Sequence, residues 1–157
     1  MKNFKIKQFA KEKAHPAFAL SDPTLLNGKY VVYKVSGLDT KGHFEGNRRY
    51  NEFFLLRQVI GANWPGVYIP STPSKKLVGN KDVRFIIERR FYLERFILQL
   101  SQIPYLIESH EFQTFIRPAQ HISNGEVPDI EKLLKEIQQE PPSKILAKYK
   151  KAFDLTD

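Results

Sequence analysis

Cysteine is absent from this sequence of 157 residues, and so are long apolar runs. Without cysteine there are no disulfides, thiolate metal sites or cysteine nucleophiles, and a small secreted scaffold held by disulfides is disfavoured. No run approaches the roughly 18 apolar residues of a membrane-spanning helix. The first residues also carry no apolar signal-peptide stretch. We therefore expect a soluble protein of the cytosol.

The short motifs of common enzyme classes are missing as well. Glycine-rich nucleotide loops, the serine elbow of hydrolases and the paired-histidine zinc motif do not occur. The four histidines, His15, His43, His110 and His121, show no metal-ligand spacing, and the acidic residues are dispersed. We expect no enzymatic activity, no cofactor and no metal site.

Positive charge is abundant and unevenly distributed. The formal net charge is +8. Residues 41–90 carry ten Lys and Arg against four acids, and residues 1–13 carry five Lys against one acid, whereas residues 120–157 carry six Lys against seven acids. A localised basic region indicates binding to phosphate groups of lipids or nucleic acids. The alternative is a basic surface that only maintains solubility.

The residue pattern changes from strands to helices along the chain. Residues 29–37 are β-branched and aromatic, Asn27-Gly28 before them is a hairpin signal, and residues 43–49 predict a further strand. Helical spacing then predicts helices near residues 51–61, 82–101 and 109–116, capped by Asn51, Asp82 and Ser109. We expect an α+β fold in which a three-stranded antiparallel meander packs against a helical subdomain, with a helical C-terminal tail.

Composition suggests three segments. Residues 1–16 are rich in lysine and predict a basic N-terminal arm, and residues 17–118 predict the folded domain. Residues 119–157 predict a linker and an amphipathic helical tail. This tail could begin a larger assembly or dimerise, or it could pack back on the domain.

The first candidate binding element is Arg48-Arg49-Tyr50, directly before a predicted helix. A helix N-terminus offers unpaired N–H groups and a partial positive charge. An arginine beside it completes an anion site, since its planar fork matches phosphate oxygens. The alternative is a pair of surface arginines followed by a core tyrosine.

The second candidate element is the proline-rich segment 70–76, which ends in Lys75 and Lys76. Prolines stiffen the segment, so that the lysines are presented to a phosphate in a defined place. A Pro-x-x-Pro segment can also serve as a ligand for SH3 domains. A loop embedded between two helices is a poor free ligand, and we favour the phosphate interpretation.

The third candidate is Arg89. On a helical wheel it falls within about 30° of the centre of an apolar stripe, whereas Arg90 lies about 70° from that centre. The stripe consists of Ile86, Leu93, Ile97 and Leu100. A buried arginine needs an anion, which is either a carboxylate of the protein or a ligand.

Taken in order, these elements resemble the PX (phox-homology) domain of sorting nexins. The resemblance rests on Arg48-Arg49-Tyr50, on the proline-rich loop with its basic end, and on the helix spanning residues 85–96. The approach at residues 21–23 and the strand at residues 30–35 fit as well. It covers about residues 17–118.

The resemblance implies a role for each candidate. Arg49 would bind the 3-phosphate of an inositol lipid, Tyr50 would pack under the inositol ring, Lys75 would contact the 1-phosphate, and Arg89 would bind ring hydroxyls. Additional candidates are Arg48, Lys76 and Arg90, and Leu77 and Val78 are expected to insert into the membrane.

The resemblance further implies a membrane-recruitment module. Its ligand would be phosphatidylinositol 3-phosphate on the anionic cytosolic face of endosomes, in a sorting nexin-like trafficking protein. Some sorting nexins continue into a helical dimerisation (BAR) domain, so the chain could be a piece of a longer protein. The first alternative is a protein-interaction scaffold with little lipid affinity. The second is a nucleic-acid binder, which we do not expect because basic strands interleaved with aromatics are lacking.

Overall fold

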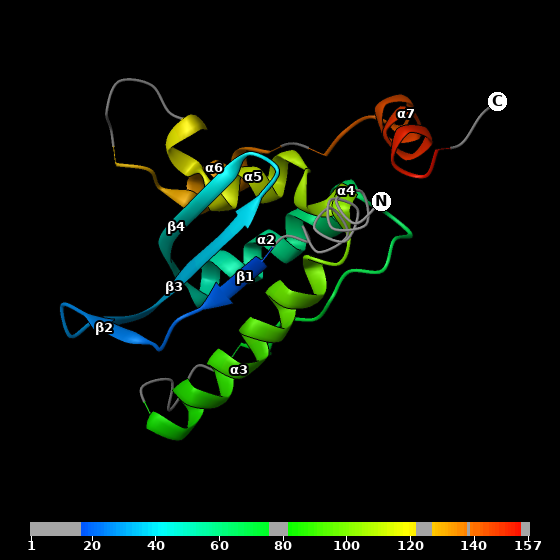
Figure 1. Ribbon diagram of the computed structural model, residues 1–157. Helices are drawn as coiled ribbons and strands as arrows, with labels where there is room; N and C mark the ends of the chain where they lie inside the picture. Colours follow the sequence, from blue (N-terminus) through cyan, green and yellow to red (C-terminus); the bar gives the residue numbers. More distant parts are fainter. Residues whose placement is uncertain (1–16, 76–81, 122–126, 138, 155–157) are drawn as a thin grey trace, which may run out of the picture.

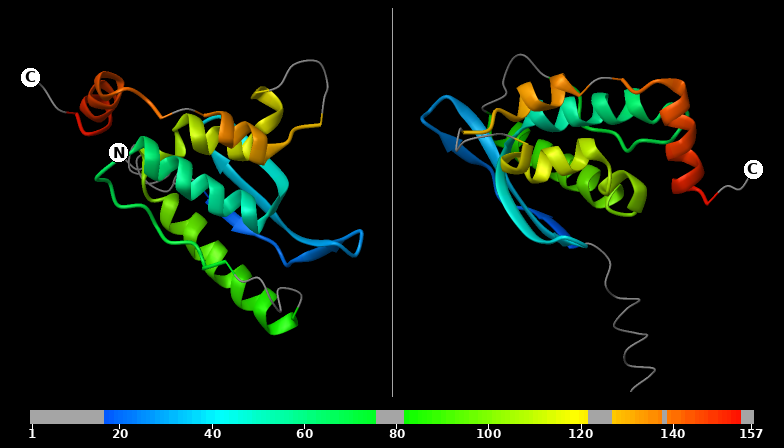
Figure 2. Two further views of the ribbon diagram at one scale, coloured as in Figure 1. Left: turned by 180° about the vertical axis from the view of Figure 1, so that it is seen from behind. Right: turned by 90° about the horizontal axis from the view of Figure 1, so that it is seen from above.

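A computed structural model describes residues 17–75, 82–121, 127–137 and 139–154 (Figure 1). Its strands are β1 (Ala17–Leu20), β2 (Thr24–Leu26), β3 (Tyr30–Asp39) and β4 (Gly42–Arg49). Its helices are α2 (Tyr50–Asn63), α3 (Val83–Leu100), α4 (Pro104–Ile107), α5 (His110–Ile116), the 3₁₀ turn η1 (Pro118–His121), α6 (Ile130–Glu136) and α7 (Pro142–Ala152). The sheet forms one layer and the helices cover one of its faces (Figure 2). This is the expected α+β fold.

The sheet contains four antiparallel strands but is three strands wide. β4 pairs along one side of β3, whereas β1 and β2 pair in succession along its other side. The break between β1 and β2 contains Pro23, which has no N–H to donate to a sheet. Ser21 bridges the break, since its hydroxyl accepts a hydrogen bond from the backbone N–H of Lys34 at 3.0 Å. The expected meander is therefore present with its first strand interrupted.

The turn between β2 and β3 confirms the hairpin predicted at Asn27-Gly28. Both residues have positive φ, 52° and 63°, as a type I′ turn requires. The N–H of Lys29 closes the turn on the carbonyl of Leu26 at 3.0 Å.

Helix starts follow the predicted caps in two of three cases. The Asp82 carboxylate accepts hydrogen bonds from the first turn of α3, and the Ser109 hydroxyl accepts one from Phe112 in α5. The predicted cap at Asn51 is wrong, because α2 begins at Tyr50 directly after β4. There the carboxylate of Glu52 accepts the N–H of Arg49 at 2.5 Å, which stabilises the strand-to-helix junction.

Helix α3 is buried in its second half only. The residues that it places in the core are Leu93, Phe96, Ile97 and Leu100. Ile86, which the apolar stripe predicted as a core residue, is half-buried, because the first turns of α3 extend beyond the other helices (Figure 1). After α3 ends, Pro104 occupies the first position of α4, where its missing N–H costs nothing.

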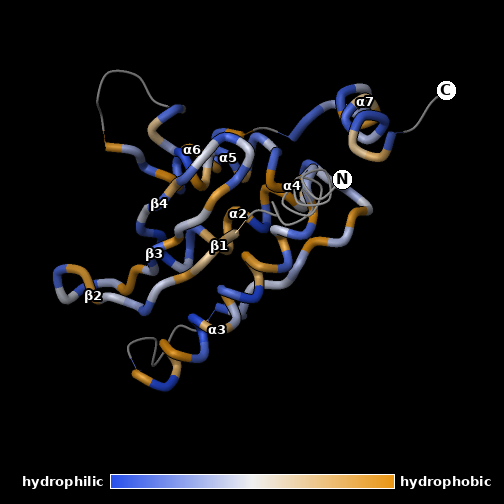
Figure 3. The backbone as a smooth tube through the Cα atoms, viewed as in Figure 1, coloured by the Kyte–Doolittle hydropathy of each residue, from blue (hydrophilic) through white to orange (hydrophobic). Residues whose placement is uncertain are grey.

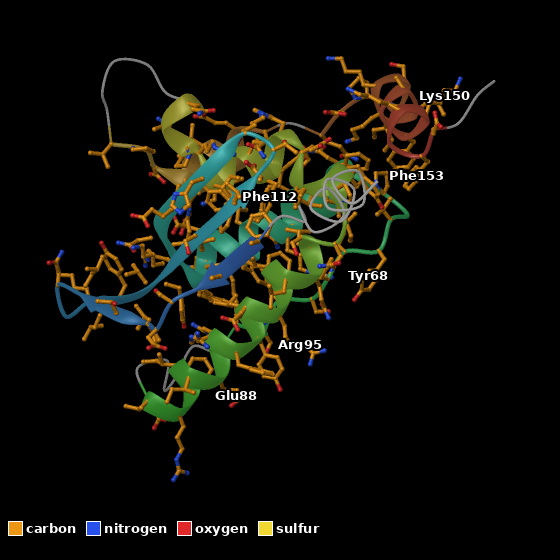
Figure 4. All side chains as sticks on the ribbon, viewed as in Figure 1. Tyr68, Glu88, Arg95, Phe112, Lys150 and Phe153 are labelled. Atoms are coloured by element: carbon orange, nitrogen blue, oxygen red, sulfur yellow. The ribbon has the colours of Figure 1, made fainter. Side chains whose placement is uncertain are left out.

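Aromatic rings fill the space between the sheet and the helices. Phe112 of α5 is fully buried there (Figure 4) and meets Phe18 of β1 edge to face, with ring centroids 5.7 Å apart. Phe53 of α2 likewise meets Phe115 of α5 at 5.1 Å. The first contact joins β1 to α5, and the second joins α2 to α5.

Both C-terminal helices pack against the rest of the molecule. Leu134 of α6 is fully buried against α2 and α5. Tyr149 of α7 stacks on Trp64 at 5.5 Å, and the Lys148 ammonium donates a hydrogen bond to the Asn63 carbonyl at 2.5 Å. These contacts join the predicted tail to the predicted domain. α7 lies at the opposite end of the molecule from the first turn of α3 (Figures 1 and 2).

Candidate functional site

A cavity of about 330 Å³ lies between the first half of α3 and the irregular segment that follows α2. Its walls are Ser71, Thr72, Pro73 and Ser74 on one side and Phe85, Glu88, Arg89 and Tyr92 on the other. The labelled Glu88 shows which part of α3 carries this wall (Figure 4). The cavity is therefore built from the proline-rich segment and the arginine helix that the sequence singled out.

Arg89 contributes the positive charge in the cavity wall. Its guanidinium carbon lies 3.8 Å from the ring centre of Tyr50 and 4.3 Å from that of Phe85. Among the described residues, its buried Nε has no hydrogen-bond partner, and no carboxylate forms an ion pair with it. Burial lowers the pKa of Arg89. A partly desolvated cation without a protein anion favours an anionic ligand.

Tyr50 joins the two walls of the cavity. Its ring lies under Arg89, and its hydroxyl donates a hydrogen bond to the carbonyl of Pro73. Burial raises the pKa of this phenol, and the nearby Arg89 opposes that rise. Arg57 of α2 holds the same segment three residues before Pro73, since its Nε donates to the carbonyl of Pro70 at 2.9 Å. Ser71 and Thr72 therefore lie between two fixed points of the backbone.

Lys75 and Arg49 lie at the edges of this cluster and are not part of the cavity wall. The Lys75 ammonium is 4.5 Å from the ring centre of Phe54, and that ring is 6.2 Å from the ring of Tyr50. Arg49 is exposed, with its guanidinium 4.3 Å from the ring centre of Tyr30. Both cations are therefore positioned by aromatic faces and remain accessible for a further anion.

Arg48 and Arg90, two of the additional candidates, do not line the cavity. Arg48 is buried, and its guanidinium donates to the carbonyls of Phe115 and Ile116 at 2.7 and 3.3 Å. Arg90 donates to the carbonyl of Leu20 at 2.9 Å and pairs with Asp22 and Glu94 at 3.4 and 3.3 Å. Both arginines are thus held by the fold outside the cavity wall, although the buried Nε of Arg90 has no hydrogen-bond partner among the described residues.

Three predicted residues, Lys76, Leu77 and Val78, lie outside the described part of the chain. Within the described part, no cluster of His, Asp or Glu side chains is arranged to hold a metal ion. None of the described helices combines the length and the apolar character that crossing a bilayer requires.

The arrangement of sheet, arginine helix and proline-rich segment agrees with the family profile that the sequence matches. Residues 37–119 match the profile described as PX domain. The chain belongs to the PX domain family. The matched residues run from near the end of β3 to η1 and so contain Arg49, Tyr50, Lys75 and Arg89.

By their titles, named relatives of this PX domain include a vacuolar protein sorting-associated protein and a sorting nexin. The chain is 32% identical over 124 residues to vacuolar protein sorting-associated protein vps5 of Schizosaccharomyces pombe, covering 67% of the chain and 22% of that relative. It is 30% identical over 116 residues to sorting nexin 1 of Arabidopsis thaliana, covering 66% and 29%. The chain thus spans less than a third of either relative.

A solved structure shares the fold of this PX domain. It is the X-ray structure of a designed CISK-PX domain, which matches with a TM-score of 0.56 and 24% identity. The match covers 64% of this chain and 98% of that one.

Sequence reasoning missed several residues of the cavity. Phe85 and Tyr92 lie four residues before and three residues after Arg89, so they share its face of α3. This spacing is a signal in the sequence, but the apolar stripe of Ile86, Leu93, Ile97 and Leu100 predicts the core face of the helix without including either residue. The hydroxyl residues Ser71 and Thr72 carried no comparable signal, because their place in the wall depends on how the segment folds back on α3.

Proposed function

We propose that this PX domain recruits its protein to a membrane by binding the headgroup of a phosphoinositide, with phosphatidylinositol 3-phosphate as the preferred lipid. The relatives titled vacuolar protein sorting and sorting nexin support an endosomal membrane as its place of action. The cytosolic surface of such membranes carries anionic lipids, which attract a chain of net charge +8.

The observation that carries this proposal is the state of Arg89. It is a half-buried cation in a cavity wall, without an ion-pairing carboxylate among the described residues. A purely structural arginine would be satisfied by the protein, as Arg48 is by two carbonyls. An inositol phosphate in the cavity would supply the missing anion and hydroxyl acceptors.

Three neighbouring residues suit the remaining parts of a headgroup. Arg49 is exposed beside the N-terminus of α2, where free N–H groups favour a phosphate. Lys75 presents an ammonium beyond the end of the cavity wall. Tyr50 holds the wall closed against α3 through the Pro73 carbonyl and keeps Arg89 in place. We assign Arg49 to the 3-phosphate, Lys75 to the 1-phosphate and Arg89 to the ring.

Apolar side chains near the same end of α3 support shallow insertion into the lipid. Val83 and Ile87 are 71% and 58% exposed, and Leu25 of β2 is 53% exposed beside them. Apolar positions mark the first turn of α3 and the strand β2 (Figure 3). Exposed apolar groups next to an anion site fit a membrane surface, where both are satisfied together. Leu77 and Val78, just ahead of α3 in the sequence, belong to the same proposed contact.

Flotation with liposomes tests the proposal directly. Vesicles that differ only in their inositol lipid are compared, and we expect the chain to float best with phosphatidylinositol 3-phosphate. Arg89→Gln should weaken this binding by about 2 kcal/mol or more, which is about thirtyfold. Arg95→Gln is the matched control, because Arg95 is an exposed arginine on the same helix and outside the cavity wall (Figure 4). Equal flotation with all lipids would instead support the protein-interaction scaffold.

A thermal melt separates a ligand arginine from a structural one. Soluble inositol 1,3-bisphosphate should raise the Tm of the wild-type chain, since a ligand of the native state stabilises it by mass action. Arg89→Ala should lose this rise while its own stability changes by less than about 1 kcal/mol. A loss of about 3–5 kcal/mol without ligand would show that Arg89 belongs to the core.

A further inference from the structure

Hydroxyl side chains make up much of the cavity wall opposite Arg89. Ser71, Thr72 and Ser74 line this wall together with Pro73. These three alcohols border the same cavity that the Arg89 cation lines. Each of these hydroxyl groups can carry a covalent phosphate. Phosphate is the group that we expect the cationic cavity to attract, so the modification would place it inside the cavity.

Thr72 has the sequence context of a phosphorylation site. Proline follows it directly, and Lys75 lies three residues later. Proline-directed kinases of the cyclin-dependent type accept this combination, with proline at the next position and a basic residue at the third. The backbone from residue 68 to residue 75 forms neither helix nor strand, so a kinase cleft can bind it as extended chain once its hydrogen bonds to Arg57 and Tyr50 are broken.

We propose that Thr72 is a phosphorylation site at which a proline-directed protein kinase closes the cavity to the lipid headgroup. The kinase transfers the γ-phosphoryl group of ATP to the Oγ1 atom of Thr72. A new P–O bond forms, the Oγ1–H bond breaks, ADP leaves and the proton passes to the kinase base or to water. The consequence for lipid binding rests on the proposed function, but the placement of the phosphate does not.

Charge and tethering decide the competition between this phosphate and a lipid. Phosphothreonine carries a charge of about −1.5 to −2 at neutral pH and three acceptor oxygens. Arg89 and Glu88 are the charged residues of the wall, and Tyr92 is its other titratable group. Because Arg89 lacks a carboxylate partner among the described residues, it is the natural partner of the phosphate. A covalently attached phosphate acts at an effective concentration of about millimolar, well above that of a free headgroup.

The segment around Thr72 is also held close to α3, as a contact between a phosphate on Thr72 and Arg89 requires. Arg57 binds the Pro70 carbonyl and Tyr50 binds the Pro73 carbonyl, on either side of Thr72. A phosphate on Thr72 is therefore presented to the cavity by a fixed backbone and loses little freedom on pairing with Arg89. Kinase binding requires this segment to lift from α3, and the two hydrogen bonds are what it has to break.

The modification itself is tested with the whole chain, a cyclin-dependent kinase and ATP. Mass spectrometry should map the phosphate to Thr72, Thr72→Ala should abolish it, and Lys75→Ala should slow it. No incorporation at Thr72 in the folded chain would overturn the proposal.

The effect of the phosphate is tested with phosphothreonine encoded at Thr72 and, as a matched control, at the exposed Thr40. Flotation with phosphatidylinositol 3-phosphate vesicles should fall by about tenfold or more for phospho-Thr72 and stay unchanged for phospho-Thr40. ³¹P NMR titration gives a lipid-free measurement. Arg89 should lower the second pKa of phospho-Thr72, so Arg89→Gln should raise that pKa by about half a unit and leave phospho-Thr40 unaffected.

The two measurements separate the two proposals. If the unmodified chain floats with none of the lipids, the proposed function fails, and the ³¹P titration still decides whether the phosphate occupies the Arg89 cavity. If Arg89→Gln leaves the second pKa of phospho-Thr72 unchanged, the inference is overturned. This holds even where flotation falls, because the phosphate then acts by repelling the membrane. Unchanged flotation of phospho-Thr72, with a chain that otherwise binds, overturns it as well.

Discussion

The chain contains two pairs of adjacent arginines, one where β4 meets α2 and one on α3. In each pair the two side chains have different environments. In the first pair Arg48 is bound to backbone carbonyls, while Arg49 lies exposed over the ring of Tyr30. In the second pair Arg90 is bound to a carbonyl and two acids, while Arg89 lies over the ring of Tyr50. One arginine of each pair holds the fold together, and the other stays available to an anion.

Backbone geometry explains why adjacent arginine side chains point in different directions. Successive side chains of a strand point to opposite faces, so Arg48 enters the molecule and Arg49 leaves it. Successive side chains of a helix point about 100° apart, so Arg89 meets the cavity and Arg90 meets β1. A dipeptide of two arginines therefore places one cation inside the fold and leaves the other for the role that we propose in binding.

The largest expected effect is a loss of stability from Arg48→Leu. This change leaves the carbonyls of Phe115 and Ile116 buried without a donor, each at a cost of about 1–3 kcal/mol. We expect the free energy of unfolding to fall by about 3 kcal/mol, as measured with urea. Arg49→Gln serves as the control and should change it by less than about 1 kcal/mol. Similar losses in both variants would refute the division within this pair.

The next effect is a loss of binding from Arg49→Gln. If Arg49 contacts the 3-phosphate as we propose, its removal should weaken binding to phosphatidylinositol 3-phosphate vesicles by about 2 kcal/mol, with the fold intact. The measurement is liposome flotation at fixed salt beside a far-ultraviolet CD spectrum. A folded Arg49→Gln chain with unchanged lipid selectivity would remove Arg49 from the site.

A fifth arginine, Arg117, sharpens the comparison because it forms a largely buried ion pair. Its guanidinium pairs with Asp39 at 2.6 Å, which lowers the pKa of that carboxyl from 3.8 to about 2. The folded pKa lies below the unfolded one, so the stabilisation is complete above about pH 4 and is lost as pH falls toward 2.

We expect acidification over that range to cost about 2 kcal/mol through Asp39 alone. Urea unfolding at several pH values should show a flatter acid limb for Asp39→Asn, which lacks the titrating group. Arg48 binds carbonyls, so its contribution should not vary over the same range. An identical acid limb in wild type and Asp39→Asn would contradict the assignment.

The smallest expected effect concerns Arg90→Ala. Arg90 is partly exposed, so losing its bonds to Leu20, Asp22 and Glu94 should cost about 1 kcal/mol of stability. Flotation with phosphatidylinositol 3-phosphate vesicles should stay at the wild-type level. A binding loss as large as that of Arg89→Gln would place Arg90 in the headgroup site after all.

Much of the fold was predictable because its signals are local. The Asn27-Gly28 turn and the caps at Asp82 and Ser109 depend on residues within one turn of each other, and all three are confirmed. The cap at Asn51 was wrong because β4 continues into α2 without a break, which the composition of the junction does not reveal.

The sequence by itself determined the class of the fold, the order of its elements and the choice of Arg89 as a residue in need of an anion, since these follow from spacing along the chain. Only the tertiary structure decided which arginine of each pair is structural. Arg48 meets a carbonyl 67 residues away and Arg90 meets one 70 residues away. Such partners are fixed by how the sheet, α3 and α5 pack together, and packing of distant segments is not written in the spacing of neighbouring residues.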